Sequence, residues 1–297
     1  MTLLLLLASL PLMTEPASAA PLMTAQDLLA MPQPCADRAT AFGPAPQQVA
    51  ELRLPRGLGP HPVVILIHGG CWQAQWGFDH VRSLAAALRA EGWAVWSLEY
   101  RRLGDPGGGW PGPLEDVARG ADHLREVAGT HSLDLERVVA VGHSAGGQLA
   151  LWLAGRHRLP RDSSLHAPSP LRLRGVVSLA GITDLRAGAE AGVCGDAIRQ
   201  LLGGGPPDPP DRLGLASPIE LVPLGVPVRL VCGARDPIVP MEQARAYEAA
   251  ATRAGDTVAV EVVENVGHFE LVNPSSSAWP TVRAAVRTLL EGRPSSP

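Results

Sequence analysis

The fold is decided by the stretch Val138-Val139-Ala140-Val141-Gly142-His143-Ser144-Ala145-Gly146-Gly147. Its β-branched run leads into a Gly-x-Ser-x-Gly turn, and an apolar segment typical of a helix follows at residues 148–154. A buried strand, a tight turn and a helix in this order would raise Ser144 to the tip of the turn, with glycines where a Cβ would meet a neighbouring strand or helix. The motif alone is a weak signal, but this context favours a nucleophile over a serine in a glycine-rich turn or a helix cap.

Apolar runs typical of buried strands alternate with amphipathic segments on both sides of this stretch. Strands are expected over residues 49–54, 63–67, 94–98, 137–141, 175–180, 228–232 and 257–263. Helices are expected over residues 27–31, 80–90, 114–128, 148–154, 196–202, 241–253 and 279–290. This alternation predicts an α/β fold: a doubly wound, mostly parallel central sheet with helices on both faces. Right-handed crossovers would bring the carboxyl ends of the strands to one edge, where ligands bind.

The chain divides into four segments by composition. Residues 1–20 contain an apolar run and a small-x-small site at Ala17-Ser18-Ala19, which predicts a signal peptide and a secreted or periplasmic protein. The basic n-region of a signal peptide is missing, however. A start at Met23 would instead give a cytoplasmic protein. Residues 21–47 are expected to form an N-terminal arm and residues 48–292 the α/β domain. Residues 185–217 do not fit the alternation and are interpreted as an insertion over the site.

Composition excludes several function classes. The net charge of −4 predicts no nucleic-acid partner, and the apolar run near the start is too short for a membrane span. All 25 basic residues are arginine, which excludes a lysine base or a Schiff base. The four cysteines have no metal-ligand spacing, so no metal is expected. Cys232 is interpreted as a core residue, whereas Cys35 and Cys194 are the pair that could form a disulfide in an exported protein, which the sequence leaves open.

A serine nucleophile needs a general base and a carboxylate that orients the base. His268 fits the base, because it lies in a short loop after the last strand, whereas the other histidines precede strands or lie on helices, in polar loops or inside the elbow. Asp236 follows the preceding strand, and Pro237 biases it away from helical geometry. Asp184, after an earlier strand, is a rival acid. The order Ser144, Asp236, His268 is the order that this type of fold uses.

The run His68-Gly69-Gly70-Cys71-Trp72 ends the strand at 63–67 and supplies backbone amides without bulky side chains. We expect an oxyanion hole from the N–H groups of Gly70, Cys71 and Ala145, although Gly69 could replace either of the first two. The histidine that opens the run is expected to order the loop by hydrogen bonding. The tryptophan that closes the run either walls an acyl pocket or packs in the core.

Together these motifs resemble the α/β-hydrolase superfamily over roughly residues 48–292. The loop at 68–72, the run Glu99-Tyr100-Arg101 and the pair Trp110-Pro111 are similar to the esterase/lipase group that includes bacterial carboxylesterases and kynurenine-formamidase-like enzymes. The resemblance implies a Ser-His-Asp triad at Ser144, Asp236 and His268, an acyl-enzyme intermediate and no cofactor. The sequence departs from the pattern at Cys71, where relatives often carry glycine or an aromatic residue, and at the glycine-rich residues 104–109.

Three functions are compatible with these residues. The favoured one is a serine hydrolase of carboxylic esters, and the alternative is an arylformamidase-like amide hydrolase with the same triad. A non-catalytic binding protein on a hydrolase scaffold is disfavoured, because such proteins usually lose the nucleophile or the base. In each case the partner is a small molecule, whose identity depends on residues 185–217 and on the arm. The oligomeric state is left open.

Overall fold

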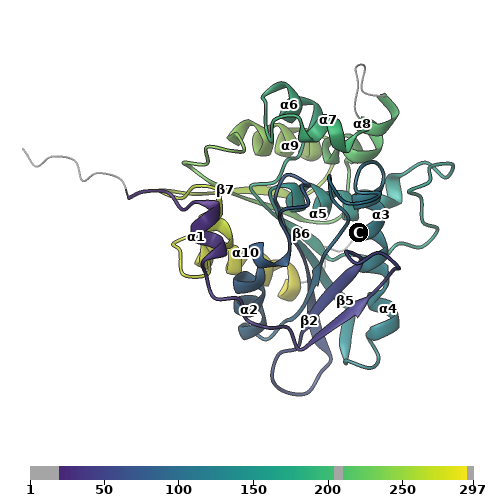
Figure 1. The fold of residues 1–297 in the computed structure, drawn as a ribbon, viewed down its shortest axis with the longest axis vertical. Coiled ribbons are helices and arrows are strands. Elements are labelled where there is room, and N and C mark those ends of the chain that lie inside the picture. Colours follow the sequence, from purple (N-terminus) through teal and green to yellow (C-terminus); the bar gives the residue numbers. More distant parts are fainter. Residues whose placement is uncertain (1–19, 204–209, 293–297) are drawn as a thin grey trace, which may run out of the picture.

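An eight-stranded sheet in the order β1-β2-β4-β3-β5-β6-β7-β8 forms the centre of the computed structural model, which describes residues 20–203 and 210–292 (Figure 1). The antiparallel edge consists of β1 (Arg38–Ala41) and β2 (Val49–Arg53), and β2 also pairs antiparallel with β4. The strands from β4 to β8 are parallel to one another. The predicted mostly parallel α/β sheet is therefore confirmed.

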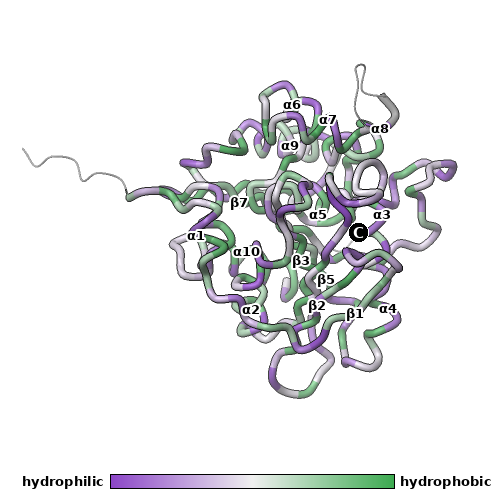
Figure 2. Tube along the Cα trace, in the orientation of Figure 1, coloured by the Kyte–Doolittle hydropathy of each residue, from purple (hydrophilic) through white to green (hydrophobic). Residues whose placement is uncertain are grey.

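The parallel strands coincide with the apolar runs of the sequence. Their bounds are β3 (His61–Ile67), β4 (Ala94–Leu98), β5 (Leu133–His143), β6 (Gly175–Leu179), β7 (Val228–Gly233) and β8 (Val258–Val263). Every residue of β4 and β6 is buried, as expected for strands covered on both faces. The apolar positions gather along these central strands in Figure 2.

Helices cover both faces of the sheet. On β3, Val63, Ile65 and Ile67 pack into one hydrophobic core, while Val64 and Leu66 pack into the other, because successive side chains of a strand point to opposite faces. The first core includes residues from α3 (Gly112–Asp122), α5 (Ala145–Gly155) and α9 (Met241–Arg253). The second includes residues from α2 (Arg82–Ala90) and α10 (Trp279–Glu291).

The segment expected to be an insertion, residues 185–217, follows β6 and forms three short helices. These are α6 (Leu185–Glu190), α7 (Ala197–Leu201) and α8 (Pro210–Ala216), which Figure 1 draws together at the top of the molecule. The remaining short elements are α1 (Ala25–Leu29), α4 (Leu124–Val127) and the 3-10 helices η1 (Phe78–His80), η2 (Arg156–Arg158), η3 (Pro218–Leu221) and η4 (Phe269–Val272).

The N-terminal part of the chain differs from the expected organisation at one point. Strand β1 lies inside the segment expected to be an arm, so the sheet begins at Arg38. The predicted signal peptide lies outside the described residues except for its last position, Ala20, and stays a prediction. Among residues 20–203 and 210–292, no helix combines the length and the apolar character that crossing a bilayer requires.

Candidate active site

Ser144 lies at the turn between β5 and α5, at the N-cap of the helix, with φ 55° and ψ −119°. A positive φ is unfavourable for a residue with a side chain and is found mainly where the surrounding structure enforces it. Here the crowding is visible: a Cβ on Gly142 would collide with the carbonyl of Gly146, and one on Gly146 would collide with the carbonyl of Ile67. The tight strand–turn–helix geometry expected around Ser144 is therefore present.

Asp236 and His268 are brought into direct contact by the loops that follow β7 and β8. The Nδ1 atom of His268 lies 2.7 Å from Oδ2 of Asp236, and both side chains are almost fully buried. The second carboxylate oxygen, Oδ1, accepts the backbone N–H groups of Ile238 at 2.7 Å and Val239 at 3.0 Å. The carboxylate is thus fixed by its own loop, and the His268 ring is oriented with Nε2 outside this contact.

The link between the serine and this pair runs through His143, the residue before Ser144. Its Nε2 lies 3.1 Å from the carbonyl oxygen of His268, and the two imidazole rings have centroids 4.5 Å apart. Among the hydrogen bonds of these described residues there is none between Ser144 Oγ and the His268 ring. Such catalytic hydrogen bonds are often long in unliganded sites and tighten when substrate binds.

A buried pair of histidines, His143 and His80, lies next to His268. Because a carbonyl only accepts, His143 Nε2 is the donor to His268, and its Nδ1 must accept from His80 Nε2 at 2.9 Å. Burial, followed by the nearby His68 and His268, lowers the pKa of His80 to about 3. Burial, followed by His268 and His80, likewise lowers the pKa of His143 well below its ordinary value. Both rings are therefore neutral at neutral pH, and His80 is a buried partner of His143.

We expect acid to destabilise the protein through His80. The unfolded chain protonates this side chain near pH 6.5, whereas the folded protein keeps it neutral down to about pH 3. The unfolded state binds more protons in this window, so the free energy of unfolding falls with falling pH, by up to about 1.4 kcal/mol per pH unit from this group. Denaturant titrations between about pH 7 and pH 4 should show a shallower slope for His80→Gln than for the control His157→Gln, whose side chain is exposed. Equal slopes would contradict the assignment.

The rival acid, Asp184, has a different role. Its carboxylate accepts the backbone N–H groups of Arg186 at 2.9 Å and Ala187 at 3.0 Å, which makes it the N-cap of α6. An N-cap side chain satisfies amides that the helix leaves unpaired. Asp184 is therefore a structural cap, and Asp236 is the carboxylate that meets the candidate base.

The loop of candidate oxyanion donors lies directly against the serine. Gly70, Cys71 and Trp72 have φ values of 106°, 52° and 53°, three successive residues in the left-handed region. A Cβ on Gly69 would lie 3.1 Å from Ser144 Cβ, and the N–H groups of Gly70 and Cys71 donate to no other group of the described chain. The N–H of Ala145, in the first turn of α5, belongs to the set that a helix leaves unpaired.

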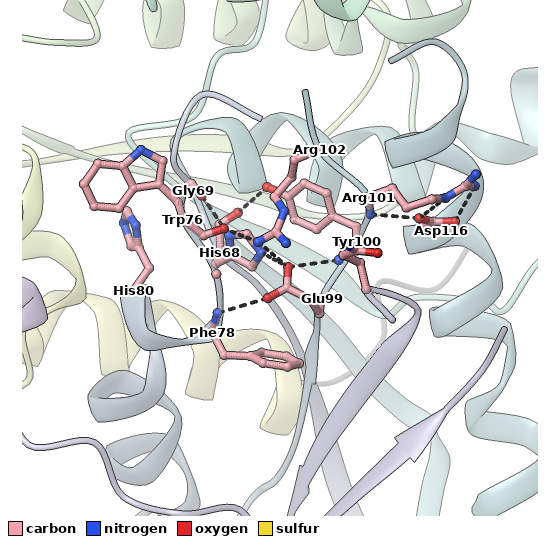
Figure 3. Close-up of polar contacts among 12 residues, drawn as sticks. His68, Gly69, Trp76, Phe78, His80, Glu99, Tyr100, Arg101, Arg102 and Asp116 are labelled. Atoms are coloured by element: carbon pink, nitrogen blue, oxygen red, sulfur yellow. Dashed lines mark hydrogen bonds and ion pairs between the residues drawn. The ribbon is translucent and has the colours of Figure 1, made fainter. Parts of the chain in front are cut away.

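A buried polar network holds the start of this loop (Figure 3). His68 donates from Nδ1 to the carbonyl of Gly69 at 2.8 Å, and its Nε2 lies 2.7 Å from Oε1 of Glu99, which confirms its expected ordering role. Arg102 contacts the same carboxylate oxygen at 2.9 Å. Burial by itself would raise the pKa of Glu99, but His68, Arg102 and the amide of Tyr100 hold it below its usual range. In the sequence, the run Glu99-Tyr100-Arg101 is notable for its resemblance to esterases, but the contact between Glu99 and His68 could not be predicted from it.

The tryptophan of the loop packs in the core. Trp72 is fully buried, and its indole N–H donates to Oε1 of Gln148 in α5 at 3.1 Å. The amide of Gln148 in turn donates to the carbonyl of Ala216 at 2.8 Å. Of the two roles that the sequence left open for Trp72, the structure supports the core role.

The disulfide joins Cys71 to Cys194, with a Cα–Cα distance of 5.6 Å across 123 residues of sequence. Cys35 is exposed and free, and Cys232 is buried and free. The pairing of Cys35 with Cys194 considered from the sequence was therefore wrong in its first partner. The reason is spatial, because the α6–α7 loop that carries Cys194 lies against the loop after β3, which carries Cys71.

Comparison with known proteins gives the same picture. A model of the BD-FAE family matches residues 52–250. The esterases LipQ and LipC of Mycobacterium tuberculosis are each 28% identical to this chain over 71% of its length, covering 51% and 53% of theirs. Kynurenine formamidase avaC of Aspergillus versicolor is 34% identical over 41% of this chain and 44% of its own. The chain thus spans about half the length of the curated relatives it matches.

Solved structures share the fold at low sequence identity. A truncated carbohydrate esterase from gut microbiota is similar with a TM-score of 0.72 and 20% identity, over 86% of this chain and 97% of its own. Esterase B from Lactobacillus rhamnosis is similar with a TM-score of 0.70 and 21% identity, over 87% of each chain. At these identities the likeness establishes the α/β architecture.

Proposed function

The chain belongs to the BD-FAE family of α/β-hydrolase-type esterases, and on that premise we propose that it hydrolyses carboxylic esters by nucleophilic catalysis at Ser144. The observation that carries the proposal is the buried contact of 2.7 Å between Asp236 and His268, made by two loops at the same sheet edge as the serine turn. A carboxylate that orients an imidazole beside a serine is the arrangement that acyl transfer requires.

In the proposed reaction, Ser144 Oγ attacks the ester carbonyl while His268 Nε2 takes its proton. Asp236 accepts the Nδ1–H of His268 and stabilises the imidazolium that forms. The tetrahedral oxyanion is held by the N–H groups of Gly70, Cys71 and Ala145. His268 then gives the proton to the departing alkoxide, which leaves as the alcohol, and an acyl-enzyme remains. His268 then deprotonates a water molecule, which attacks the acyl carbonyl carbon. The bond from this carbon to Ser144 Oγ breaks, the carboxylic acid is released, and His268 returns the proton to Ser144 Oγ.

The sequence similarity to kynurenine formamidase avaC, 34% identity over 41% of this chain, supports a second candidate function, hydrolysis of an N-formyl aryl amide. The same residues would act in the same order, and the difference lies in the leaving group. An amide nitrogen must receive a proton from His268 before the C–N bond breaks, whereas the aryloxide of an aryl ester leaves more readily. An ester therefore makes the smaller demand on this machinery.

The full chain should be assayed with p-nitrophenyl acetate and butyrate beside N-formylkynurenine, and then treated with a fluorophosphonate. We expect faster ester turnover, and loss of activity in proportion to a phosphonyl adduct that peptide mass spectrometry maps to Ser144. Faster formyl amide turnover would favour the second candidate. Absence of turnover and of an adduct would reject the proposal and favour a binding protein.

A further inference from the structure

The disulfide joins the candidate oxyanion loop to the segment that follows β6. The N–H of Cys71 is one of the loop amides that donate to no acceptor among the described residues. Cys194 lies between α6 and α7. The bridge therefore connects a residue of the proposed catalytic machinery to an element that contributes no group to the proposed reaction.

On the sheet side, the loop is held up to Gly69 and again from Trp72 onward. The network of His68, Glu99 and Arg102 fixes the Gly69 carbonyl (Figure 3). The carbonyl of Trp72 accepts the N–H of Leu103 at 2.7 Å. Between these anchors, the carbonyl of Gly70 accepts the N–H of Gln73 at 2.9 Å. The half-buried Cys71 side chain packs against the core and is covalently bound to Cys194.

Cys71 occupies a backbone conformation that is uncommon for a residue with a side chain. Its φ of 52° is left-handed, a region that is unfavourable for a residue with a Cβ. Rotation back to a negative φ would turn the plane of the neighbouring peptides, and hence the direction of the N–H groups. The direction of these amides determines how well they meet a developing oxyanion, since donors must lie 2.7–3.1 Å from it.

Backbone hydrogen bonds hold the other end of the bridge, at Cys194. The N–H of Val193 donates to the carbonyl of Gly188 at 2.9 Å, and the carbonyl of Cys194 accepts the N–H of Ala197 at 3.2 Å. Just before α6, Thr183 and Asp184 both donate their N–H groups to Oε1 of Gln243 in α9, at 2.9 Å and 2.8 Å. Hydrogen bonds thus hold the α6–α7 segment in place, and the bridge joins Cys71 to this fixed segment.

We infer that Cys194 is a positioning residue that, through the disulfide, holds the Cys71 region of the oxyanion loop in its catalytic conformation. The inference rests on the proposed function. A dithiol reductant would donate two electrons and two protons to the bridge, give the two thiols and become a cyclic disulfide itself. The fold would remain, but Cys71 would lose its covalent link to the α6–α7 segment. Both cysteines are half-buried, so the bridge is within reach of a small reductant.

The experiment compares four samples of the full chain: oxidised, reduced with dithiothreitol, Cys194→Ser, and the control Cys35→Ser, which removes a cysteine outside the bridge. The readouts are kcat and KM for p-nitrophenyl butyrate and the inhibition constant of an aryl boronic acid, whose tetrahedral adduct occupies the oxyanion site. Loss of one oxyanion donor lowers kcat by about 100- to 1000-fold, so misdirection should lower it by at least about tenfold.

We expect reduction and Cys194→Ser to lower kcat, to weaken boronate binding in parallel and to leave KM within about threefold, because the amides act on the transition state. Reductant should not slow Cys194→Ser further, Cys35→Ser should match the parent, and reoxidation should restore the parent. Circular dichroism shows whether each sample is folded. If Cys194→Ser does not fold, the inference is tested by kcat and boronate affinity of the parent before reduction, after reduction and after reoxidation.

Unchanged kcat and boronate affinity after reduction, with two additional thiols titrated, would overturn the inference even if the melting temperature fell. A parent in which all four cysteines titrate as free thiols would overturn it as well. Inactivity of the oxidised parent on every ester and formyl amide is a separate outcome, because it would reject the proposed function on which the inference rests.

Discussion

Replacing Ser144 with alanine is expected to lower kcat for ester hydrolysis by about 10⁴- to 10⁶-fold, while the protein stays folded. In the proposed mechanism the hydroxyl is the atom that forms the acyl-enzyme bond, and the remaining amides and the histidine offer no substitute for it. Alanine keeps the Cβ that the φ of 55° already accommodates, so the turn between β5 and α5 should be unchanged. The variant should also lose the fluorophosphonate adduct.

Ser132→Ala is a matched control for this change. Ser132 also has a left-handed backbone, with φ 51°, but its side chain is exposed and it lies at the opposite end of β5. Its replacement should leave kcat and KM unchanged. Persistent labelling or turnover above about one hundredth of the parent in Ser144→Ala, with no trace of unmutated protein, would show that another residue is the nucleophile.

The inner strands of the parallel part of the sheet could be predicted from sequence because they are buried on both faces. Such strands appear as continuous apolar runs, as in β3, and their order with amphipathic helices dictates the α/β class. The helix expected over 241–253 has those bounds in α9, since its apolar spacing is undisturbed. The helix expected over 114–128 is divided into α3 and α4 at His123.

The antiparallel edge could not be predicted in the same way. β1 carries three exposed residues and one half-buried one, so it has no apolar alternation that would distinguish it from an arm. Its position is set by pairing with β2, in a register from Arg38 opposite Leu52 to Ala41 opposite Val49. Pairing of this kind depends on the partner strand, which local sequence does not encode.

At the site, chain order identified Asp236 and His268 because each follows a strand of the sheet, and the carboxyl ends of parallel strands converge. The contacts that cross between loops were missed. The pairing of Cys71 with Cys194 depends on how α6 and α7 fold back toward the strand ends, which cysteine spacing does not determine. The histidine pair depends on η1 packing beside the serine turn, and the residues around His80 form no motif that would indicate this contact.

Replacing Asp236 with asparagine is expected to lower kcat by about 10⁴-fold at neutral pH, through the tautomer of His268. Because Oδ1 accepts the N–H groups of Ile238 and Val239, the asparagine carbonyl should keep that position. Its NH₂ would then face His268 Nδ1, which must accept instead of donate. The proton would move to Nε2, and that atom could no longer take the proton of Ser144.

Asp184→Asn is the matched control for this substitution, because it removes one carboxylate charge at an N-cap, a position where asparagine serves as well as aspartate. It should leave both activity and stability near those of the parent. Nitrogen-15 NMR of the His268 ring reports the tautomer directly and should show the proton on Nε2 in Asp236→Asn. A variant with the altered tautomer and near-parental kcat would remove His268 as the base, whereas an unaltered tautomer with a large loss would indicate that the charge of Asp236 matters more than its orienting role.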